Sequence, residues 1–592
     1  MGNTTKRITE RVEGLRQFLR RNGLQAFIIP STDPHQGEYV PEHWQTRQWI
    51  SGFDGSAGTA VVTLTDAALW TDSRYFIAAE EQLRGTPFRL MKDGQPETPS
   101  ITEWLCEEVK RLKGEKVKRL KGEKVTDLVV GVDGSLFTES ELMEMQDELG
   151  RAGIRLRTDL DPAETLWTDR PPIPKNKVEV QPPQLAGEPA ESKIGRVRQA
   201  LREQQADCLV ISQLDDIAWL LNMRGSDVHC NPVFVSYVLL TLNDTTLFID
   251  SEKLDASVEN YLRSIGVGIQ PYSRPIPDST LTEATRNPIP SMKAIKNDAE
   301  IEGFRQAMQR DGVAMVRFLR WLETAVPSGK ETEMSIDRKL TALRAAQPRF
   351  RGLSFDTIAA YGPHGAIVHY EATQQTDVAI QPHGLLLLDS GAQYQDGTTD
   401  ITRTIPLGPL TYEEQLDYTL VLKGHIRLAL TRFPDGISGT QIDAMARYAM
   451  WQHGINYGHG TGHGVGSYLC VHEGPHQIRH SWKPAPLHAG MTVTNEPGIY
   501  RAARHGVRIE NTMLIVADGE TEFGNFLRLE PLTLCPIDLT PVLWDMMTPD
   551  EVAYLNTYHK RVYDELSPLL THDERQWLSG KCVAMPSQQT ES

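Results

Sequence analysis

The sequence predicts an α/β protein of several domains, in which two tandem copies of one α/β unit precede a larger α+β domain. The chain has 592 residues, too many for one hydrophobic core, and about 150 residues per domain suggests three or four domains. A helical apolar stripe followed by a strand-like run occurs twice with matching residues. The last part instead contains an apolar run followed by an alternating run, the pattern of an antiparallel hairpin.

The first unit starts near the N-terminus. Apolar residues recur at helical spacing within residues 8–23, and AFIIP follows from Ala26 as a strand. The stripe consists of Val12, Leu15, Phe18 and Leu19.

The unit is repeated further along the chain. LRQFLRRNGLQAFIIPSTD from Leu15 aligns without a gap with VRQALREQQADCLVISQLD from Val197, and TLTDAALWTDS from Thr63 aligns with TLNDTTLFIDS from Thr241. This spacing is far longer than that of a solenoid repeat, so we interpret it as duplication of a whole domain. Chance similarity of two α/β units is the alternative.

We expect three domains, at residues 1–160, 161–297 and 298–592. The proline-rich stretch RPPIPKNKVEVQPPQLAGEPAESK has no apolar periodicity and reads as the connection between the two copies. At the second boundary, Asn297 and Glu300 have the spacing of a capping box that opens a long helix. Its buried stripe would consist of Ile301, Phe304, Met308, Met315, Phe318, Leu319 and Leu322.

The stretch GLLLLDSGAQYQDGTTDITRTIPLGP predicts the hairpin of the third domain. Asp389 ends the apolar strand and Asp400 lies in the returning strand, and every register of the pleat puts both carboxylates on one face. A tight Asp396-Gly397 turn would set Asp389 opposite Thr404. A wider loop would set the two aspartates directly opposite, and we favour it. Such a pair needs a cation or a shared proton, unless both side chains point into water.

Three later motifs add further candidates. His459 and His463 lie in the glycine-rich run GHGTGHGVG, where the glycines allow close approach of the backbone. Glu496 follows a strand-like run in TVTNEPGIYR, and Glu510 lies in the alternating strand VRIENTMLI. Taken singly, each has an ordinary alternative, a hydrogen-bonded loop histidine or a solvated glutamate.

Together these residues indicate a site for hard cations. Four carboxylates and one imidazole suit divalent ions such as Mn(II), and the absence of cysteine from this set of residues argues against structural zinc. Four carboxylates are too many for one ion but suit two ions that share bridging carboxylates.

The ordered set Asp389, Asp400, His463, Glu496 and Glu510 resembles the five-ligand signature of the pita-bread metallopeptidases, specifically the Xaa-Pro aminopeptidase (aminopeptidase P) family. The runs SGFDGSAGTAVVT, LDDIAWLLNMRGSDV, KNDAEIEG and FLRLEPLTLCPID extend the resemblance over nearly the whole chain. It implies two creatinase-like N-terminal domains and a catalytic domain whose curved antiparallel sheet holds two metals, usually manganese. In it Asp389 would bind one metal, His463 and Glu496 the other, and Asp400 and Glu510 would bridge.

The resemblance also implies residues that contact the substrate. His369, His459 and His472 would be histidines around the metals or the substrate, and Tyr500 and Arg508 would line a proline pocket and support the ligands. An activated water would attack the carbonyl before proline, with His472 stabilising the oxyanion and Glu496 moving protons. The substrates would be peptides with N-terminal Xaa-Pro. Prolidase activity on Xaa-Pro dipeptides and a non-enzymatic peptide-binding module are the alternatives.

Composition restricts the other classes of partner. The net charge of −17 disfavours nucleic acid and anionic membranes as partners. The six cysteines are far apart and the N-terminus is polar, so we expect a cytoplasmic protein without disulfides. VKRLKGEK occurs twice in succession, at 109–116 and 117–124, and predicts a solvated insertion because glutamates interrupt its basic residues. The family resemblance suggests a homodimer.

Overall fold

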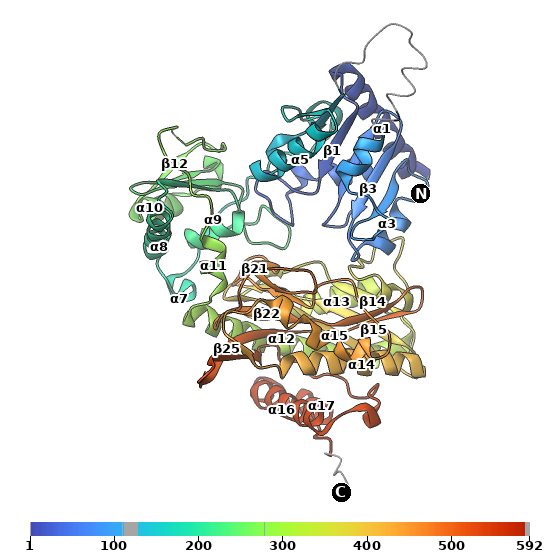
Figure 1. Cartoon of the computed structure of the whole chain (residues 1–592). Coiled ribbons are helices and arrows are strands. Elements are labelled where there is room, and N and C mark those ends of the chain that lie inside the picture. Colours follow the sequence, from blue (N-terminus) through green and yellow to red (C-terminus); the bar gives the residue numbers. More distant parts are fainter. Residues whose placement is uncertain (1, 109–110, 112–127, 278, 587–592) are drawn as a thin grey trace. The chain divides into compact units, whose positions relative to one another are not determined.

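The computed structural model describes residues 2–108, 111, 128–277 and 279–586 (Figure 1). The doubled VKRLKGEK lies outside the described residues, apart from Arg111. The chain divides into two compact units. The first comprises residues 1–176 with 212–214 and 227–229, and the second comprises residues 177–211, 215–226 and 230–592.

The first α/β module is a six-stranded sheet in the order β4-β3-β2-β1-β5-β6 with helices packed against it. The predicted helix and strand are both present, and Val12, Leu15 and Leu19 are buried against the sheet. The elements of this module are α1 (Gly2–Asn22), β1 (Ala26–Pro30), α2 (Thr46–Ser51), β2 (Thr59–Thr63), β3 (Ala67–Thr71), α3 (Phe76–Gln82), β4 (Arg89–Lys92), β5 (Leu128–Val132), α5 (Glu139–Arg151), β6 (Ile154–Arg157) and α6 (Ala163–Leu166).

The second α/β module contains a four-stranded sheet in the order β12-β11-β10-β8. Its elements are β7 (Glu179–Val180), α7 (Pro183–Ala186), α8 (Ala190–Glu203), β8 (Cys208–Ile211), α9 (Leu214–Leu220), β9 (Met223–Arg224), β10 (Tyr237–Thr241), β11 (Thr245–Phe248), α10 (Ala256–Ser264) and β12 (Val267–Gln270).

Four strands of each sheet are paired in the same way, which confirms the predicted duplication. Strands β1, β2, β3 and β4 correspond to β8, β10, β11 and β12, with two antiparallel pairings followed by one parallel pairing. The first sheet has two further strands, β5 and β6. The matched arginines of the two modules also make equivalent hydrogen bonds. Arg16 Nε donates to the carbonyl of Thr63 at 3.2 Å, and Arg198 Nε donates to the carbonyl of Thr241 at 3.0 Å. The aligned sequences therefore place the same side chains at the same points of one fold.

A long helix opens the third module, as predicted. Asn297 caps α12 (Asp298–Ala325) and forms the capping box with Glu300. Such a cap contributes about 1 kcal/mol because it satisfies backbone N–H groups that the helix leaves free. Of the predicted stripe, Phe304, Met308, Met315, Phe318 and Leu322 are buried, whereas Ile301 and Leu319 are partly buried.

The third module folds mainly as antiparallel sheets flanked by helices. Helix α14 packs against α15 and against strands of these sheets, and α12 packs against α13 and α16 (Figure 1). The short helix α11 (Ile289–Ala294) precedes the module. The remaining elements are α13 (Glu333–Ala345), β13 (Phe350–Leu353), β14 (Ile358–Tyr361), β15 (Leu385–Ser390), β16 (Ala392–Tyr394), β17 (Gly397–Thr398), β18 (Ile401–Pro406), α14 (Tyr412–Ala429), β19 (Phe433–Pro434), α15 (Asp443–Trp451), β20 (Gly462–Gly464), β21 (Glu473–Ile478), β22 (Thr492–Asn495), β23 (Gly498–Arg501), β24 (His505–Arg508), β25 (Asn511–Thr521), β26 (Gly524–Pro531), α16 (Pro549–Leu566) and α17 (His572–Lys581).

The predicted hairpin is present, but the favoured register is wrong. Asp389 pairs with Thr402, and Tyr394 pairs with Gly397, so the tip is the two-residue loop Gln395-Asp396. Contacts with α12 explain this position. A Cβ on Gly303 would lie 2.1 Å from the carbonyl oxygen of Asp396, so the helix and the hairpin tip touch at the backbone. Because the shift is an even number of residues, Asp389 and Asp400 keep a common face.

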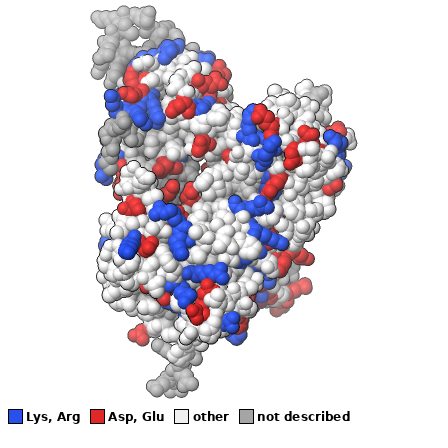
Figure 2. All heavy atoms as spheres, turned by 180° about the vertical axis from the view of Figure 1, so that it is seen from behind, with Lys and Arg blue, Asp and Glu red and all other residues white. Residues whose placement is uncertain are grey.

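Charged side chains of both signs lie next to one another on the face shown in Figure 2. Among the described residues, no helix is both long enough and apolar enough to cross a bilayer.

Buried His559 on α16 predicts sensitivity to acid. Its Nε2 accepts a hydrogen bond from the backbone N–H of Ile537 at 3.1 Å. Burial, and then the Arg403 guanidinium, lower the pKa of His559 to about 4. Between pH 6.5 and 4 the unfolded chain therefore binds a proton that the folded chain does not, so stability falls as pH falls. The loss is about 2–3 kcal/mol.

The variant His559→Gln keeps a hydrogen-bond acceptor and removes the titration. We expect its thermal midpoint to fall less than that of the wild type between pH 7 and pH 4.5, measured on metal-free protein. Parallel pH profiles of the two proteins would contradict this assignment.

Candidate metal centre

The five predicted ligands lie in or beside strands of the third module. Asp389 lies within β15 and His463 within β20. The other three carboxylates lie next to the end of a strand. Asp400 comes directly before β18, Glu496 directly after β22, and Glu510 between β24 and β25. Positions at strand ends release a side chain from the strict alternation of the pleat, so these carboxylates can turn toward a common centre.

The predicted strand around Glu510 is interrupted. The chain leaves the ladder at Ile509 and Glu510, so β24 and β25 pair with different strands. The backbone N–H of Glu510 instead donates to the carbonyl of Thr402 at 3.1 Å. This contact joins the break to β18, close to Asp400.

These residues converge in space. Ligand atoms of Asp400, His463 and Glu510 all lie within 4.8 Å of one another. His463 Nε2 lies 3.5 Å from Asp400 Oδ2 and 3.6 Å from Glu496 Oε1. Two ligand atoms that are each about 2.1 Å from a common ion are separated by roughly 3–3.5 Å, so the observed spacing suits ligation.

The orientation of His463 also suits ligation. Its Nδ1 lies 2.9 Å from the carbonyl oxygen of Gly464 and so carries the proton. In the neutral ring the lone pair is then on Nε2, which faces the carboxylates. Gly462 allows this placement, because a Cβ there would lie 1.9 Å from the carbonyl oxygen of Thr494.

Without a cation, burial and mutual repulsion raise the pKa of three of the clustered carboxyl groups. Burial, and then Asp389 and Glu496, raise the pKa of Asp400 well above its usual range. Burial, and then Asp400 and Glu496, do the same to the pKa of Glu510. Burial and the Asp389 charge raise the pKa of Glu496 to about 7, against the lowering effect of Arg508. Each carboxylate is thus destabilised in its charged form by its neighbours.

Asp389 has an oxygen available for an ion. Its Oδ2 accepts from Arg508 Nη2 at 2.7 Å and from Nε at 3.1 Å. Its Oδ1 is buried and accepts no hydrogen bond from the described residues. Four carboxylates with one guanidinium carry three negative charges, which two divalent cations would offset. The residues present therefore fit a pair of divalent ions.

Arg508 begins a chain of hydrogen bonds through the site. Its Nη1 donates to Tyr500 Oη at 2.7 Å, and Tyr500 Oη lies 2.7 Å from His459 Nε2. His459 Nδ1 lies 2.7 Å from the carbonyl oxygen of Gly460, so Nδ1 carries the proton and Nε2 accepts from Tyr500. The order of donors therefore runs from Arg508 to Tyr500 to His459.

The two remaining predicted histidines lie differently. The rings of His472 and His463 meet edge to face with centroids 4.4 Å apart, and His472 also acts on the pKa of Asp400 and of Glu496. His369 lies next in the chain to Val368, whose carbonyl accepts from Arg508 Nη2 at 3.3 Å. His472 thus lies at the carboxylate cluster, and His369 follows a residue that contacts Arg508.

Two threonines at the site were not predicted. Thr402 Oγ1 donates to Glu510 Oε2 at 2.8 Å and accepts from Arg508 Nε at 3.2 Å. Thr494 Oγ1 lies 3.3 Å from Glu496 Oε1 and accepts from the backbone N–H of His463. Each lies two positions from a predicted ligand, Asp400 or Glu496. A spacing of two positions from a candidate ligand, the period of a strand, could have identified them.

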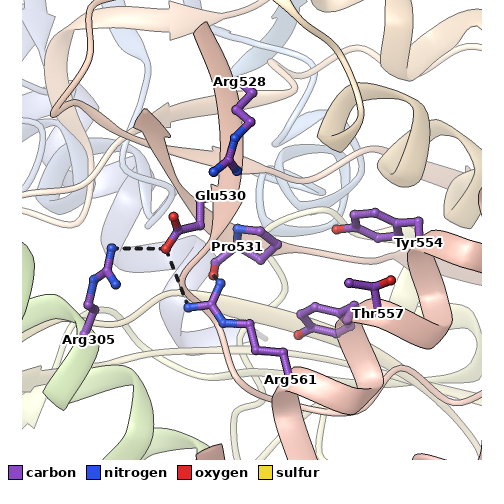
Figure 3. Close-up of a pocket in the computed structure, with 8 residues that line it drawn as sticks. Arg305, Arg528, Glu530, Pro531, Tyr554, Thr557 and Arg561 are labelled. Atoms are coloured by element: carbon purple, nitrogen blue, oxygen red, sulfur yellow. Dashed lines mark hydrogen bonds and ion pairs between the residues drawn. The ribbon is translucent and has the colours of Figure 1, made fainter. Parts of the chain in front are cut away.

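A separate pocket of about 450 Å³ lies between α12, β26 and α16 and contains none of the predicted ligands (Figure 3). Its arginines already face carboxylates. Arg305 and Arg561 lie 3.1 and 3.7 Å from Glu530 Oε1, and Arg528 lies 3.4 Å from Asp518. Three arginines and one glutamate line this pocket, so its lining is net positive although each arginine has a carboxylate partner.

Comparison with known proteins agrees with this organisation. The model of metallopeptidase family M24 matches residues 302–517, and the model of the C-terminal region of this peptidase family matches residues 525–585. Two models of the creatinase/prolidase N-terminal domain match residues 11–161 and 169–282.

Two relatives that match over nearly their full length are named as Xaa-Pro aminopeptidases. Xaa-Pro aminopeptidase 1 of Dictyostelium discoideum is 38% identical over 97% of this chain and 96% of its own length. A probable Xaa-Pro aminopeptidase P of Laccaria bicolor is 38% identical over 98% of this chain and 94% of its own length. The crystal structure of X-prolyl aminopeptidase from Caenorhabditis elegans, described as a cytosolic enzyme with a di-nuclear active site, superimposes with a TM-score of 0.91. It is 35% identical and covers 98% of this chain and 100% of that chain. The chain therefore belongs to the Xaa-Pro aminopeptidase family of M24 metallopeptidases.

Proposed function

We propose that this chain is a metal-dependent aminopeptidase that releases the N-terminal residue from peptides whose second residue is proline. The observation that carries the proposal is the convergence of Asp400, His463 and Glu510, whose ligand atoms lie within 4.8 Å of one another. The likeness to the Caenorhabditis elegans enzyme, with its di-nuclear site, supports it.

Two divalent ions at this cluster would supply a nucleophile at neutral pH by lowering the pKa of water. In the proposed assignment Asp389 would hold one ion, His463 and Glu496 would hold the other, and Asp400 and Glu510 would contribute to both. Oxygen-rich ligands with a single imidazole favour Mn(II).

The chain's own residues divide the remaining work. Arg508 fixes one oxygen of Asp389 with two donors and so directs the other oxygen toward the ion site. Glu496 takes the proton of the attacking water and delivers it to the leaving proline nitrogen. His472 donates a hydrogen bond to the carbonyl oxygen as negative charge develops there. The negative cluster also attracts the free ammonium group of the substrate.

Selection of proline requires a pocket. The imide nitrogen has no hydrogen, so no backbone acceptor can recognise it, and the ring itself must be accommodated. We place His459, Tyr500 and Arg508 along this pocket and His369 near the substrate backbone. The hydrogen bonds from Arg508 through Tyr500 to His459 hold these side chains in fixed orientations.

The same proposal includes three domains, at residues 1–160, 161–297 and 298–592. The family matches, in the same order along the chain, support this division. A cytoplasmic location is proposed by analogy with the Caenorhabditis elegans enzyme, which is described as cytosolic. The homodimer stays a prediction.

A substrate panel tests the proposed function. Purified protein, stripped of metal and reloaded with Mn(II), would be assayed on Xaa-Pro dipeptides, longer Xaa-Pro peptides and matched Xaa-Ala peptides. We expect kcat/KM to be at least about 100-fold higher for longer Xaa-Pro peptides than for Xaa-Ala peptides, a difference of about 2.7 kcal/mol in transition-state binding.

The other outcomes identify the alternatives. Cleavage of dipeptides alone would indicate a prolidase. Retention of no metal by elemental analysis, with no cleavage, would indicate a peptide-binding module. Equal rates on Xaa-Pro and Xaa-Ala peptides would refute the proposed specificity.

A further inference from the structure

The residue proposed to stabilise the oxyanion, His472, lies outside regular structure. Residues 467–473 run from a turn at Ser467 and Tyr468 to the start of β21 at Glu473, and His472 occupies the last irregular position. A strand ladder therefore does not hold its backbone. Gln393 Nε2 and Thr398 Oγ1 hold the middle of residues 467–473 by donating to the carbonyl of Leu469 at 2.9 and 3.3 Å. The groups that hold the two ends of this segment lie closest in the chain to the turn and to His472.

Arg224 of β9 holds the first end. Its Nε donates to the carbonyl of Tyr468 at 2.6 Å, and its Nη2 donates to the carbonyl of Ser467 at 3.0 Å. Its Nη1 donates to carbonyls of the second module itself, Ala218 at 3.1 Å and Met223 at 2.9 Å. One guanidinium thus joins the second module to the segment that carries His472.

Only arginine can make this connection. The Arg224 side chain is buried, and burial lowers its pKa to about 10. A buried cation is costly unless many acceptors surround it, and the planar fork supplies donors in several fixed directions at once. A lysine at this position has three donors on one nitrogen and cannot reach carbonyls on both sides.

Glu473 holds the other end. Its carboxylate is buried and forms an ion pair with Lys296, and Lys293 Nζ lies 3.4 Å from its second oxygen. Lys293 belongs to α11, which packs against β21, and Lys296 lies between α11 and α12, directly before the N-cap residue Asn297. Lys296 Nζ also donates to the carbonyl of Lys293 at 3.0 Å.

The second module completes this cluster. Lys293 pairs with Asp215 and lies 3.6 Å from Asp216 Oδ1, and both aspartates belong to α9. Asp215 aligns with Asp33 of the first module. Asp33 has a different role, because its Oδ1 accepts from the backbone N–H groups of His35 and Gly37 at 2.9 and 3.2 Å. Asp215 thus pairs with a lysine of α11, whereas Asp33 bonds to the backbone of its own loop.

We infer that Arg224 and Glu473 are positioning residues for His472, so that the second module forms part of the catalytic apparatus. The inference rests on the proposed function, in which His472 contacts the substrate oxygen. Arg224 fixes the chain before His472 and Glu473 fixes it directly after. Weakening either anchor lets the imidazole leave the position that the developing oxyanion requires, whereas substrate binding is affected little.

A double-mutant cycle tests this on the Mn(II)-loaded protein with a longer Xaa-Pro peptide. We expect His472→Ala to lower kcat about 100-fold. Arg224→Lys should lower kcat by about 10-fold or more and change KM by less than about 3-fold. In the His472→Ala background, Arg224→Lys should cost less than about 2-fold, because its effect passes through His472.

Arg198→Lys is the matched control. Arg198 also donates to backbone carbonyls within the second module, at Thr241 and Asn243, but has no contact with residues 467–473 in the described structure. It should leave kcat within about 2-fold. In metal-free protein, amide hydrogen exchange of residues 467–473 should rise in Arg224→Lys and not in Arg198→Lys, a readout independent of activity.

The outcomes separate the two hypotheses. If His472→Ala is silent, the proposed role of His472 fails. If His472→Ala lowers kcat but Arg224→Lys is silent, or adds its full effect in the double variant, the positioning inference fails. Should Arg224→Lys not yield folded protein, Glu473→Gln is taken through the same cycle, with the same expected non-additivity.

Discussion

Asp400→Asn should lower kcat by at least about 10³-fold, because the substitution removes a carboxylate proposed to be shared by both ions. The same change should stabilise the metal-free protein. Burial and the neighbouring carboxylates raise the pKa of Asp400, so its charged form is unfavourable there without a cation. Thermal midpoints with and without Mn(II), together with elemental analysis, measure both effects.

The prediction is specific because the same substitution should lower kcat and yet stabilise the metal-free protein. Wild-type protein should gain about 4 kcal/mol at a Mn(II) concentration of 1,000 times the dissociation constant, and Asp400→Asn should lose most of that gain. Asp435→Asn is the control, since that carboxylate lies at the surface and pairs with His488. Near-normal turnover with two bound metals in Asp400→Asn would contradict the bridging role.

Gly462→Ala should lower kcat/KM by about 100-fold and weaken metal retention. A Cβ at this position would lie 1.9 Å from the carbonyl oxygen of Thr494, a backbone atom that cannot rotate away. Strand β20 must therefore move, and His463 moves with it. A displacement of about 1 Å at a reacting centre is enough for a loss of this size.

Gly460→Ala is the matched control, two residues earlier in the same run. Its nearest atoms beyond the chain neighbours, Arg479 Cβ and the carbonyl oxygen of Ile478, would lie 3.5 Å from the new Cβ, an ordinary contact. We expect activity within about 2-fold of the wild type. Equal effects of the two substitutions would show that the glycines of this run act through flexibility and not through close approach.

The duplication was readable from sequence because it rests on local features. Helical spacing of apolar residues, the strand that follows and the Asn297–Glu300 capping box each depend on side chains a few positions apart. The structure repeats the helix and the strand that follows it in both modules, with equivalent strand pairing. Residue type likewise indicated the chemistry of the site, since carboxylates and one imidazole are typical of hard divalent cations.

Register was not determined by these local features. The period-two rule fixed the face shared by Asp389 and Asp400, but it allows every even shift of the pairing. The observed pairing of Asp389 with Thr402 depends on where the hairpin tip meets α12, at the close contact between Gly303 and Asp396. Such a contact joins residues that the hairpin sequence alone does not relate.

By itself the sequence determined the order of the folding units, the faces of their helices and strands, and the kinds of ligand at the site. Only the tertiary structure decided that Arg508 holds Asp389, 119 residues away in the chain, and that Arg224 and Lys296 hold the segment carrying His472. The physical reason is the distance along the chain over which each effect acts. Backbone preferences and periodicity act over a few residues, whereas a buried ion or hydrogen bond forms wherever packing brings a donor to an acceptor.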